Sequence, residues 1–283
     1  MRGGLGIMLA AWLSLAGPAA AQEAALLERG RYLVDGIAGC GNCHTPKGPG
    51  GELPGMALAG GLVIEEPGAF RAVVPNITPD IETGIGAWSD AQVALAIREG
   101  RRPDGSLIGP PMPIELYRGI ADRDLAAIVV YLRSVPPVRH AVAEKSTYQF
   151  PLPPAYGPAV GSVPPPAETA VARGAYLAGP VGHCIECHTP MAPGGQRDWS
   201  RTGAGGSPLA TPLGPVVPRN ITPHRTEGIG AWTDDEIRRA ITEGISLTGH
   251  QLGPPMGYAY YARMRRADLD DVVAYLRSLP PSP

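Results

Sequence analysis

Phenylalanine is nearly absent from this chain, with only two residues among 283, whereas there are 38 glycines and 33 prolines. The charges are almost balanced, with 24 Lys and Arg against 26 Asp and Glu. The chain therefore lacks the excess of basic residues that is typical of nucleic-acid-binding proteins, and we expect no nucleic-acid partner. Beyond the N-terminal stretch, no apolar run approaches the length of a transmembrane helix. Residues 279–283 do not form an amphipathic tail, so we expect membrane association only through partners.

The first 21 residues have the pattern of an export signal. Arg2 provides a positive start, residues 5–15 are apolar but too short for a stable anchor, and residues 19–21 are three alanines that fit a cleavage site. We expect cleavage before Gln22 and export to the periplasm. An uncleaved N-terminal anchor is the alternative.

All four cysteines lie in two copies of the motif Cys-x-x-Cys-His. The copies consist of Cys40, Cys43 and His44, and of Cys184, Cys187 and His188. This spacing is typical of covalent haem c attachment. Two cysteines three residues apart lie on one side of a helical turn and reach both vinyl groups of one haem. The next residue is then directed at the iron, so we expect His44 and His188 to be the proximal ligands of two covalently bound haems.

Four cysteines also allow a zinc site or two disulfides. Zinc would require the two cysteine pairs to meet across a long linker, although each pair has its own sequence context. Disulfides would not explain a histidine directly after each pair. The haem interpretation also suits the scarcity of phenylalanine, because a porphyrin face can replace aromatic core.

The two motifs belong to a repeat, because Cys40 and Cys184 are 144 residues apart and other segments recur at the same offset. The recurring segments begin at Arg29 and Arg173, Asn76 and Asn220, Gly84 and Gly228, Pro110 and Pro254, and Tyr131 and Tyr275. A fixed period of this size indicates two copies of one folded unit. We expect a signal peptide over 1–21, domains over 22–138 and 172–283, and a proline-rich, semi-stiff linker over 139–171.

Each copy is expected to contain three helices. The first covers 24–34 or 167–178, and the third covers 122–134 or 267–278. The second begins at a capping box, Ser89 to Gln92 in one copy and Thr233 to Glu236 in the other, and ends at Gly100 or Gly244. Proline and glycine dominate between the haem motif and the second helix, and no strand pattern is persuasive. The chain is therefore expected to be all-α.

Met112 and Met256 are the candidate sixth ligands, because each lies 72 residues after the first cysteine of its motif and follows two prolines. Thioether sulfur raises the reduction potential and suits electron transfer. The alternatives are core packing for either methionine and ligation of the second iron by His250. The methionines without a counterpart at the 144-residue offset are expected in packing or surface positions; they are Met56, Met191 and Met264.

Other recurring residues allow two interpretations each. Trp88 and Trp232 pack in a core or donate an indole N–H to a haem propionate. A second recurring set either holds a turn or contacts a haem propionate; it consists of Asn76, Thr78, Asn220 and Thr222. The remaining histidines are expected to be solvated.

Both repeats resemble the cytochrome c domains of bacterial alcohol, aldehyde and sorbitol dehydrogenase cytochrome subunits. The resemblance rests on Cys-x-x-Cys-His-Thr-Pro, Asn-Ile-Thr-Pro, Gly-Ile-Gly-x-Trp, the Pro-Met loop and the closing Tyr-Leu-Arg-Ser helix. It implies two tandem cytochrome c-like domains of the all-α cytochrome c fold, a periplasmic location, and electron transfer from a dehydrogenase towards the respiratory chain. The implied partners are an electron-donating dehydrogenase and a downstream cytochrome, oxidase or quinone system.

We expect an electron carrier, or an electron-transfer subunit of a dehydrogenase complex, rather than an enzyme. The alternative is a di-haem enzyme such as a peroxidase or a thiosulfate-oxidising cytochrome, which usually needs one open iron position; paired methionines argue that both irons are closed. The haems are expected to differ in potential, because Arg101, Arg102 and Asp104 are replaced by Ile245, Ser246 and Thr248 in the second copy. Two arginines favour the higher potential on the first haem.

Overall fold

The computed structural model describes residues 18–211 and 214–283, so most of the expected export signal, residues 1–17, lies outside the described residues. The first repeat contains α1 (Pro18–Tyr32), the π-helical turn η1 (Leu33–Ile37), α2 (Cys40–His44), α3 (Asp90–Glu99), α4 (Ile114–Tyr117) and α5 (Asp122–Ser134). The second contains α6 (Ala170–Tyr176), η2 (Leu177–Val181), α7 (Cys184–Cys187), η3 (Trp199–Arg201), α8 (Asp234–Glu243), α9 (Tyr258–Tyr261) and α10 (Arg266–Ser278). Apart from the 3-10 turn η3, the helical order is the same in both repeats.

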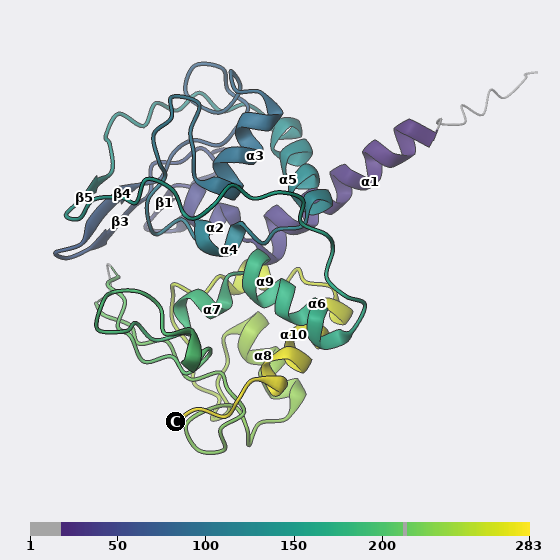
Figure 1. Ribbon diagram of the computed structural model, residues 1–283, viewed down its shortest axis with the longest axis vertical. Helices are drawn as coiled ribbons and strands as arrows, with labels where there is room; N and C mark the ends of the chain where they lie inside the picture. Colours follow the sequence, from purple (N-terminus) through teal and green to yellow (C-terminus); the bar gives the residue numbers. More distant parts are fainter. Residues whose placement is uncertain (1–17, 212–213) are drawn as a thin grey trace, which may run out of the picture.

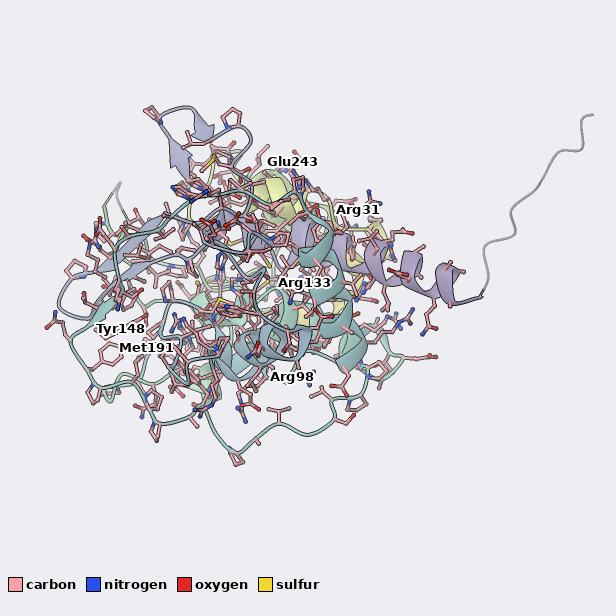
Figure 2. The ribbon with its side chains drawn as sticks, turned by 90° about the horizontal axis from the view of Figure 1, so that it is seen from above. Arg31, Arg98, Arg133, Tyr148, Met191 and Glu243 are labelled. Atoms are coloured by element: carbon pink, nitrogen blue, oxygen red, sulfur yellow. The ribbon has the colours of Figure 1, made fainter. Side chains whose placement is uncertain are left out.

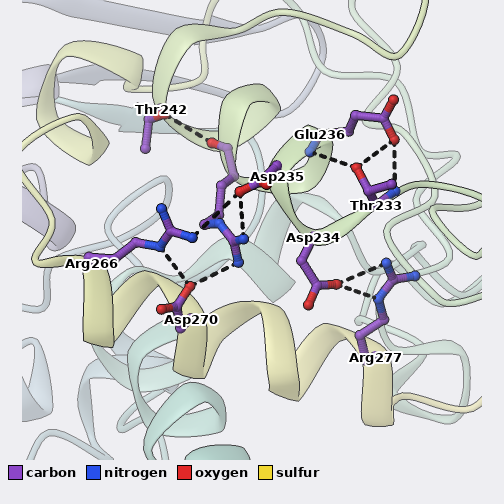
Figure 3. A network of polar contacts seen from close by, with 9 residues as sticks. Thr233, Asp234, Asp235, Glu236, Thr242, Arg266, Asp270 and Arg277 are labelled. Atoms are coloured by element: carbon purple, nitrogen blue, oxygen red, sulfur yellow. Dashed lines mark hydrogen bonds and ion pairs between the residues drawn. The ribbon is translucent and has the colours of Figure 1, made fainter.

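The capping and stop signals of the second helix of each copy are confirmed. Ser89 and Thr233 each form a complete capping box at the start of α3 and α8. Gly100 and Gly244 end these helices with φ values of 65° and 68°, a left-handed conformation that glycine adopts without a Cβ clash. Ion pairs then attach each helix to the last helix of its repeat, as Figure 3 shows for Arg277 and Asp234 between α10 and α8.

The expectation of an all-α chain is wrong. The structure is 37% helical and contains two small antiparallel sheets among the described residues. One sheet pairs β1 (Lys47–Gly48) with β2 (Gly51–Glu52); the other has the order β3 (Val63–Glu66), β4 (Phe70–Val73), β5 (Thr147–Tyr148). These strands have two to four residues, too few to show a clear alternating pattern, and β5 comes from the linker.

Within each repeat, the first and last helices cross at a glycine: α1 packs on α5 and α6 packs on α10. A Cβ atom added at Gly30 would lie 1.9 Å from the Ala127 carbonyl oxygen. A Cβ atom added at Gly174 would lie 1.9 Å from the Asp271 carbonyl oxygen. The helix backbones therefore approach as closely as they do because neither glycine has a side chain.

The two repeats lie against each other (Figure 1) and share one contiguous apolar core. Leu33 and Ile37 of the first repeat and Leu177 and Val181 of the second are all at most 3% exposed and belong to that core. Besides the linker, this shared core therefore connects the two copies, a contact that the sequence did not predict. The first turns of α1 project from this body (Figures 1 and 2), and residues 19–25 are exposed.

A reciprocal tyrosine contact joins the repeats. The Tyr176 hydroxyl accepts a hydrogen bond from the Ala121 N–H at 3.2 Å and donates one to Asp124 at 2.8 Å. The equivalent Tyr32 hydroxyl accepts from the Arg265 N–H at 3.2 Å and donates to Asp268 at 2.5 Å. Ala121 and Arg265 are the N-cap residues of α5 and α10. Each repeat therefore satisfies a free N–H at the start of the other repeat's last helix.

Among the described residues, no helix is both long enough and apolar enough to cross a bilayer.

Candidate haem sites

Each Cys-x-x-Cys-His motif forms a single helical turn that starts after a left-handed residue. Gly39 precedes α2 with φ 56°, and His183 precedes α7 with φ 42°. The π-helical turns η1 and η2 lead into these residues. The two cysteines of each motif therefore lie one turn apart, as the addition of both thiols to one haem requires.

The histidine of each motif has one ring nitrogen fixed by a backbone carbonyl. His44 Nδ1 lies 2.9 Å from the Pro75 oxygen, and His188 Nδ1 lies 2.6 Å from the Arg219 oxygen. A carbonyl only accepts hydrogen bonds, so Nδ1 carries the proton and Nε2 keeps its lone pair for a metal. Burial lowers the pKa of both imidazoles, which favours the neutral form that binds iron. Both histidines thus fit the role of a proximal haem ligand.

The four cysteines are free thiols in partly buried positions, so neither disulfide of the alternative interpretation is formed. Burial raises the pKa of Cys40 and Cys187 to about 12 and that of Cys184 to about 11, and it also raises the pKa of Cys43. Within the described part of the chain, no three His, Cys, Asp or Glu residues are grouped as a metal site would require. The structure therefore does not support the zinc interpretation.

Met112 and Met256 occupy equivalent loops. We call residues 107–112 the first Met loop and residues 251–256 the second Met loop. Both loops contain a cis Pro-Pro bond directly before the methionine and lead into a short helix, α4 or α9. Both methionines are partly buried, and Met112 packs against the shared core. His250, the alternative ligand for the second iron, is an exposed residue.

The two haem motifs lie at the interface between the repeats. Asn42, inside the first motif, donates to the Pro255 carbonyl of the second Met loop at 3.2 Å. The Tyr260 hydroxyl donates to Glu52 at 2.6 Å, and the Tyr117 ring contacts the His183 ring edge-on with centroids 6.0 Å apart. The sequence did not predict this placement, because Asn42 is replaced by Glu186 in the second copy and its partner Pro255 lies 213 residues away.

Two buried tyrosines near the motifs were also missed. Tyr117 and Tyr261 are 5% and 9% exposed. Burial raises the pKa of both hydroxyls, and the nearby cysteines of the motifs raise it further. A signal was present in the sequence, since the two tyrosines are 144 residues apart.

The recurring asparagines and threonines hold turns. Asn76 accepts from the Thr78 N–H at 2.9 Å and donates to the Val138 carbonyl at 2.8 Å. Asn220 makes the equivalent bonds, and its amide donates to the Ser282 carbonyl at 2.6 Å. These side chains fasten the end of each repeat, which supports the turn interpretation. Trp88 and Trp232 are partly buried against the core.

Not every remaining histidine is solvated as expected. His140 is half-buried, and its Nδ1 lies 2.9 Å from the Ala59 carbonyl oxygen. Of the unmatched methionines, Met191 is exposed and Met264 packs against the core, in agreement with the expectation for both.

Comparisons with known proteins agree with this geometry. The cytochrome c family matches residues 171–280, which cover most of the second repeat but none of the first. The diheme cytochrome c-type protein of Cereibacter sphaeroides is 32% identical over 86% of this chain and 82% of its own length. The chain therefore belongs to the cytochrome c family, although the expectation of two tandem cytochrome c domains is only partly supported.

Other relatives are longer than this chain. The cytochrome c subunit of the quinone-dependent alcohol dehydrogenase of Gluconobacter oxydans is 32% identical over 94% of this chain and 58% of the relative. A nicotinate dehydrogenase subunit of Pseudomonas putida is 34% identical over 92% of this chain, which spans only 22% of that protein. The expected class, an electron carrier or electron-transfer subunit that binds haem c, is confirmed.

Proposed function

We propose that this chain is a periplasmic di-haem cytochrome that passes electrons from a dehydrogenase towards the respiratory chain. One observation carries the proposal: the two motif histidines are fixed in the same way by carbonyls that each lie 31 residues downstream. Because both imidazoles have Nδ1 bound to a carbonyl and Nε2 left for a metal, two haems are indicated rather than one. A bound haem supplies one-electron exchange between ferric and ferrous iron.

The chain provides the haem attachments and the ligands in each repeat. Thioether bonds form at Cys40, Cys43, Cys184 and Cys187. His44 and His188 bind the irons from the proximal side, and Met112 and Met256 bind from the distal side. The units correspond to residues 22–138 and 172–283, with the linker over 139–171 and a cleaved signal over 1–21.

The partners follow from the relatives. Several relatives are named as cytochrome subunits of alcohol, gluconate and fructose dehydrogenases. For this chain we propose an electron-donating dehydrogenase and a downstream cytochrome, oxidase or quinone system, with membrane association through those partners. Co-purification of the native protein with its electron donor tests this assignment, and recovery of the chain without any dehydrogenase contradicts an obligate subunit.

Intact-mass analysis and visible spectroscopy test the haem assignments. The exported protein should start at Gln22 and carry the mass of two haems that acid acetone does not remove. Met112→Ala should open only the first iron and Met256→Ala only the second, with loss of half of the methionine–iron charge-transfer band in each. A single haem contradicts the di-haem proposal, and an unchanged band contradicts the corresponding ligand.

A further inference from the structure

The two Met loops differ in what covers them. The linker passes over the first Met loop, where the Tyr148 hydroxyl donates to the Pro110 carbonyl at 3.2 Å and the Tyr156 hydroxyl donates to the Ile108 carbonyl at 2.7 Å. Both hydrogen bonds are partly buried. Tyr148 is labelled in Figure 2.

Equivalent glycines of the two loops show the difference directly. Gly109 is buried, and a Cβ atom added there would lie 2.5 Å from the Tyr148 ring and 2.8 Å from the Leu152 side chain. Gly253, its counterpart 144 residues later, is exposed and would have no atom within 4 Å of an added Cβ. Among the described residues, this apolar cover therefore lies over Gly109 of the first Met loop and not over Gly253 of the second. We call Tyr148, Leu152 and Tyr156 the distal clamp.

The last residues of the second Met loop are held by hydrogen bonds that water can replace. The Tyr258 hydroxyl donates a hydrogen bond to the Gly253 carbonyl at 3.2 Å. The Asn42 amide donates one to the Pro255 carbonyl, also at 3.2 Å. Both hydrogen bonds are exposed. Pro254 and Pro255 are exposed, whereas their counterparts in the first loop are partly buried. Exposed hydrogen bonds contribute little net stability, because water offers the same partners.

The linker is itself fixed, so the distal clamp does not move freely. Strand β5 pairs with β4, Arg101 donates to the Pro154 carbonyl at 3.4 Å, and the Val160 N–H donates to Glu99 at 2.6 Å. Arg118 binds both Glu99 and the Pro158 carbonyl. The prolines between these points restrict the chain further.

We propose that the distal clamp holds the Met112 loop closed, so that an added iron ligand displaces Met256 at lower concentration than it displaces Met112. This inference rests on the proposed function, since it needs a haem with a distal methionine in each repeat. In the exchange, the iron–sulfur bond of a methionine breaks and a bond to the added ligand forms, with no change in oxidation state. The loop must move away for this to happen, and moving the first loop also breaks its contacts with the clamp. Tyr148, Leu152 and Tyr156 are thus positioning residues for the first haem.

Imidazole titration of the ferric holoprotein tests the proposal. The methionine–iron charge-transfer band should disappear in two phases, with half-saturation concentrations separated by about tenfold, which corresponds to about 1.4 kcal/mol. In a Met256→His background the remaining band reports the first haem alone, and in a Met112→His background it reports the second. The phase at lower imidazole should belong to the second haem.

Substitutions in the distal clamp provide a second test by the same imidazole titration. Tyr148→Ala combined with Leu152→Ala should lower the imidazole concentration needed at the first haem to that of the second and leave the second unchanged. Lys145→Ala, at an exposed position of the same linker, is the matched control and should alter neither haem. Tyr258→Phe removes only an exposed hydrogen bond and should leave both haems nearly unchanged.

The outcomes separate the clamp from the proposed function. If the wild-type protein releases Met112 at the same or lower imidazole concentration than Met256, the clamp proposal is wrong. It is also wrong if the double variant folds and leaves the first haem unchanged. If the ferric protein lacks the methionine–iron band before imidazole is added, or carries one haem, the proposed ligands fail instead. The wild-type comparison alone decides the case if the double variant does not fold.

Discussion

Gly30→Ala and Gly174→Ala are expected to destabilise the protein by about 2 kcal/mol each. At both positions an added Cβ would lie 1.9 Å from a backbone carbonyl oxygen of the facing helix. Ordinary contacts between carbon and oxygen are about 3.3 Å or longer, so the helices must separate by more than 1 Å.

Two effects of opposite sign set this magnitude. Overpacking costs about 1–3 kcal/mol, and the upper end applies here because the obstacle is backbone rather than a flexible side chain. Alanine is a better helix former than glycine by about 1 kcal/mol, which offsets part of this cost. The net loss is therefore about 2 kcal/mol.

Urea unfolding of the holoprotein at 25 °C measures the effect through the midpoint at constant slope. Gly161→Ala is the control, because an added Cβ there meets no atom within 4 Å, and it should leave the midpoint nearly unchanged. If Gly30→Ala is as stable as the wild type, the helices do not cross at this glycine and the description of the crossing is wrong.

Three further substitutions and one redox titration have definite expected outcomes. Tyr176→Phe should cost about 2 kcal/mol in thermal unfolding, because it removes a charge-assisted hydrogen bond and leaves the buried Ala121 N–H without its partner. Tyr32→Phe should cost less, about 1 kcal/mol, because water can bind the exposed Arg265 N–H in place of the hydroxyl. An unchanged melting temperature for both would show that the reciprocal contact does not stabilise the interface. The pKa of Asp122 is lowered, chiefly by a hydrogen bond from Ser162, so its contribution to stability is present above about pH 4 and is lost as the pH falls through the lowered value. Asp122→Asn should accordingly reduce the acid dependence of unfolding, and an identical pH profile would refute this role. A redox titration of the holoprotein should need two one-electron steps. In the described part of the chain the linker covers the first Met loop and not the second, and burial tunes haem potential. A single step would contradict unequal haem surroundings.

Local signals in the sequence were reliable where the determinant is local. Ser89 with Gln92 and Thr233 with Glu236 predict the starts of α3 and α8, and Gly100 predicts the end of α3. These features depend on backbone groups within four residues, so no tertiary information is needed. The haem motifs are equally local, because both cysteines and the histidine lie in one turn.

Features that depend on distant residues were missed. Strand β5 pairs Thr147 with Arg71, and neither short segment carries a pattern that selects the other. The half-buried state of His140 likewise depends on the Ala59 carbonyl far along the chain. The distal clamp could not be predicted either, since the proline-rich linker has no second copy in the chain with which its residues can be compared.

The contacts of Asn42 and Glu52 have a consequence for maturation. Both residues belong to the first haem segment, yet their partners, Pro255 and Tyr260, lie close to the end of the chain. In a chain synthesised from its N-terminus, the first haem motif therefore exists before the residues that contact it from the second repeat. Under the proposed haem attachment, Cys40 and Cys43 are reachable before the contacts with Pro255 and Tyr260 form.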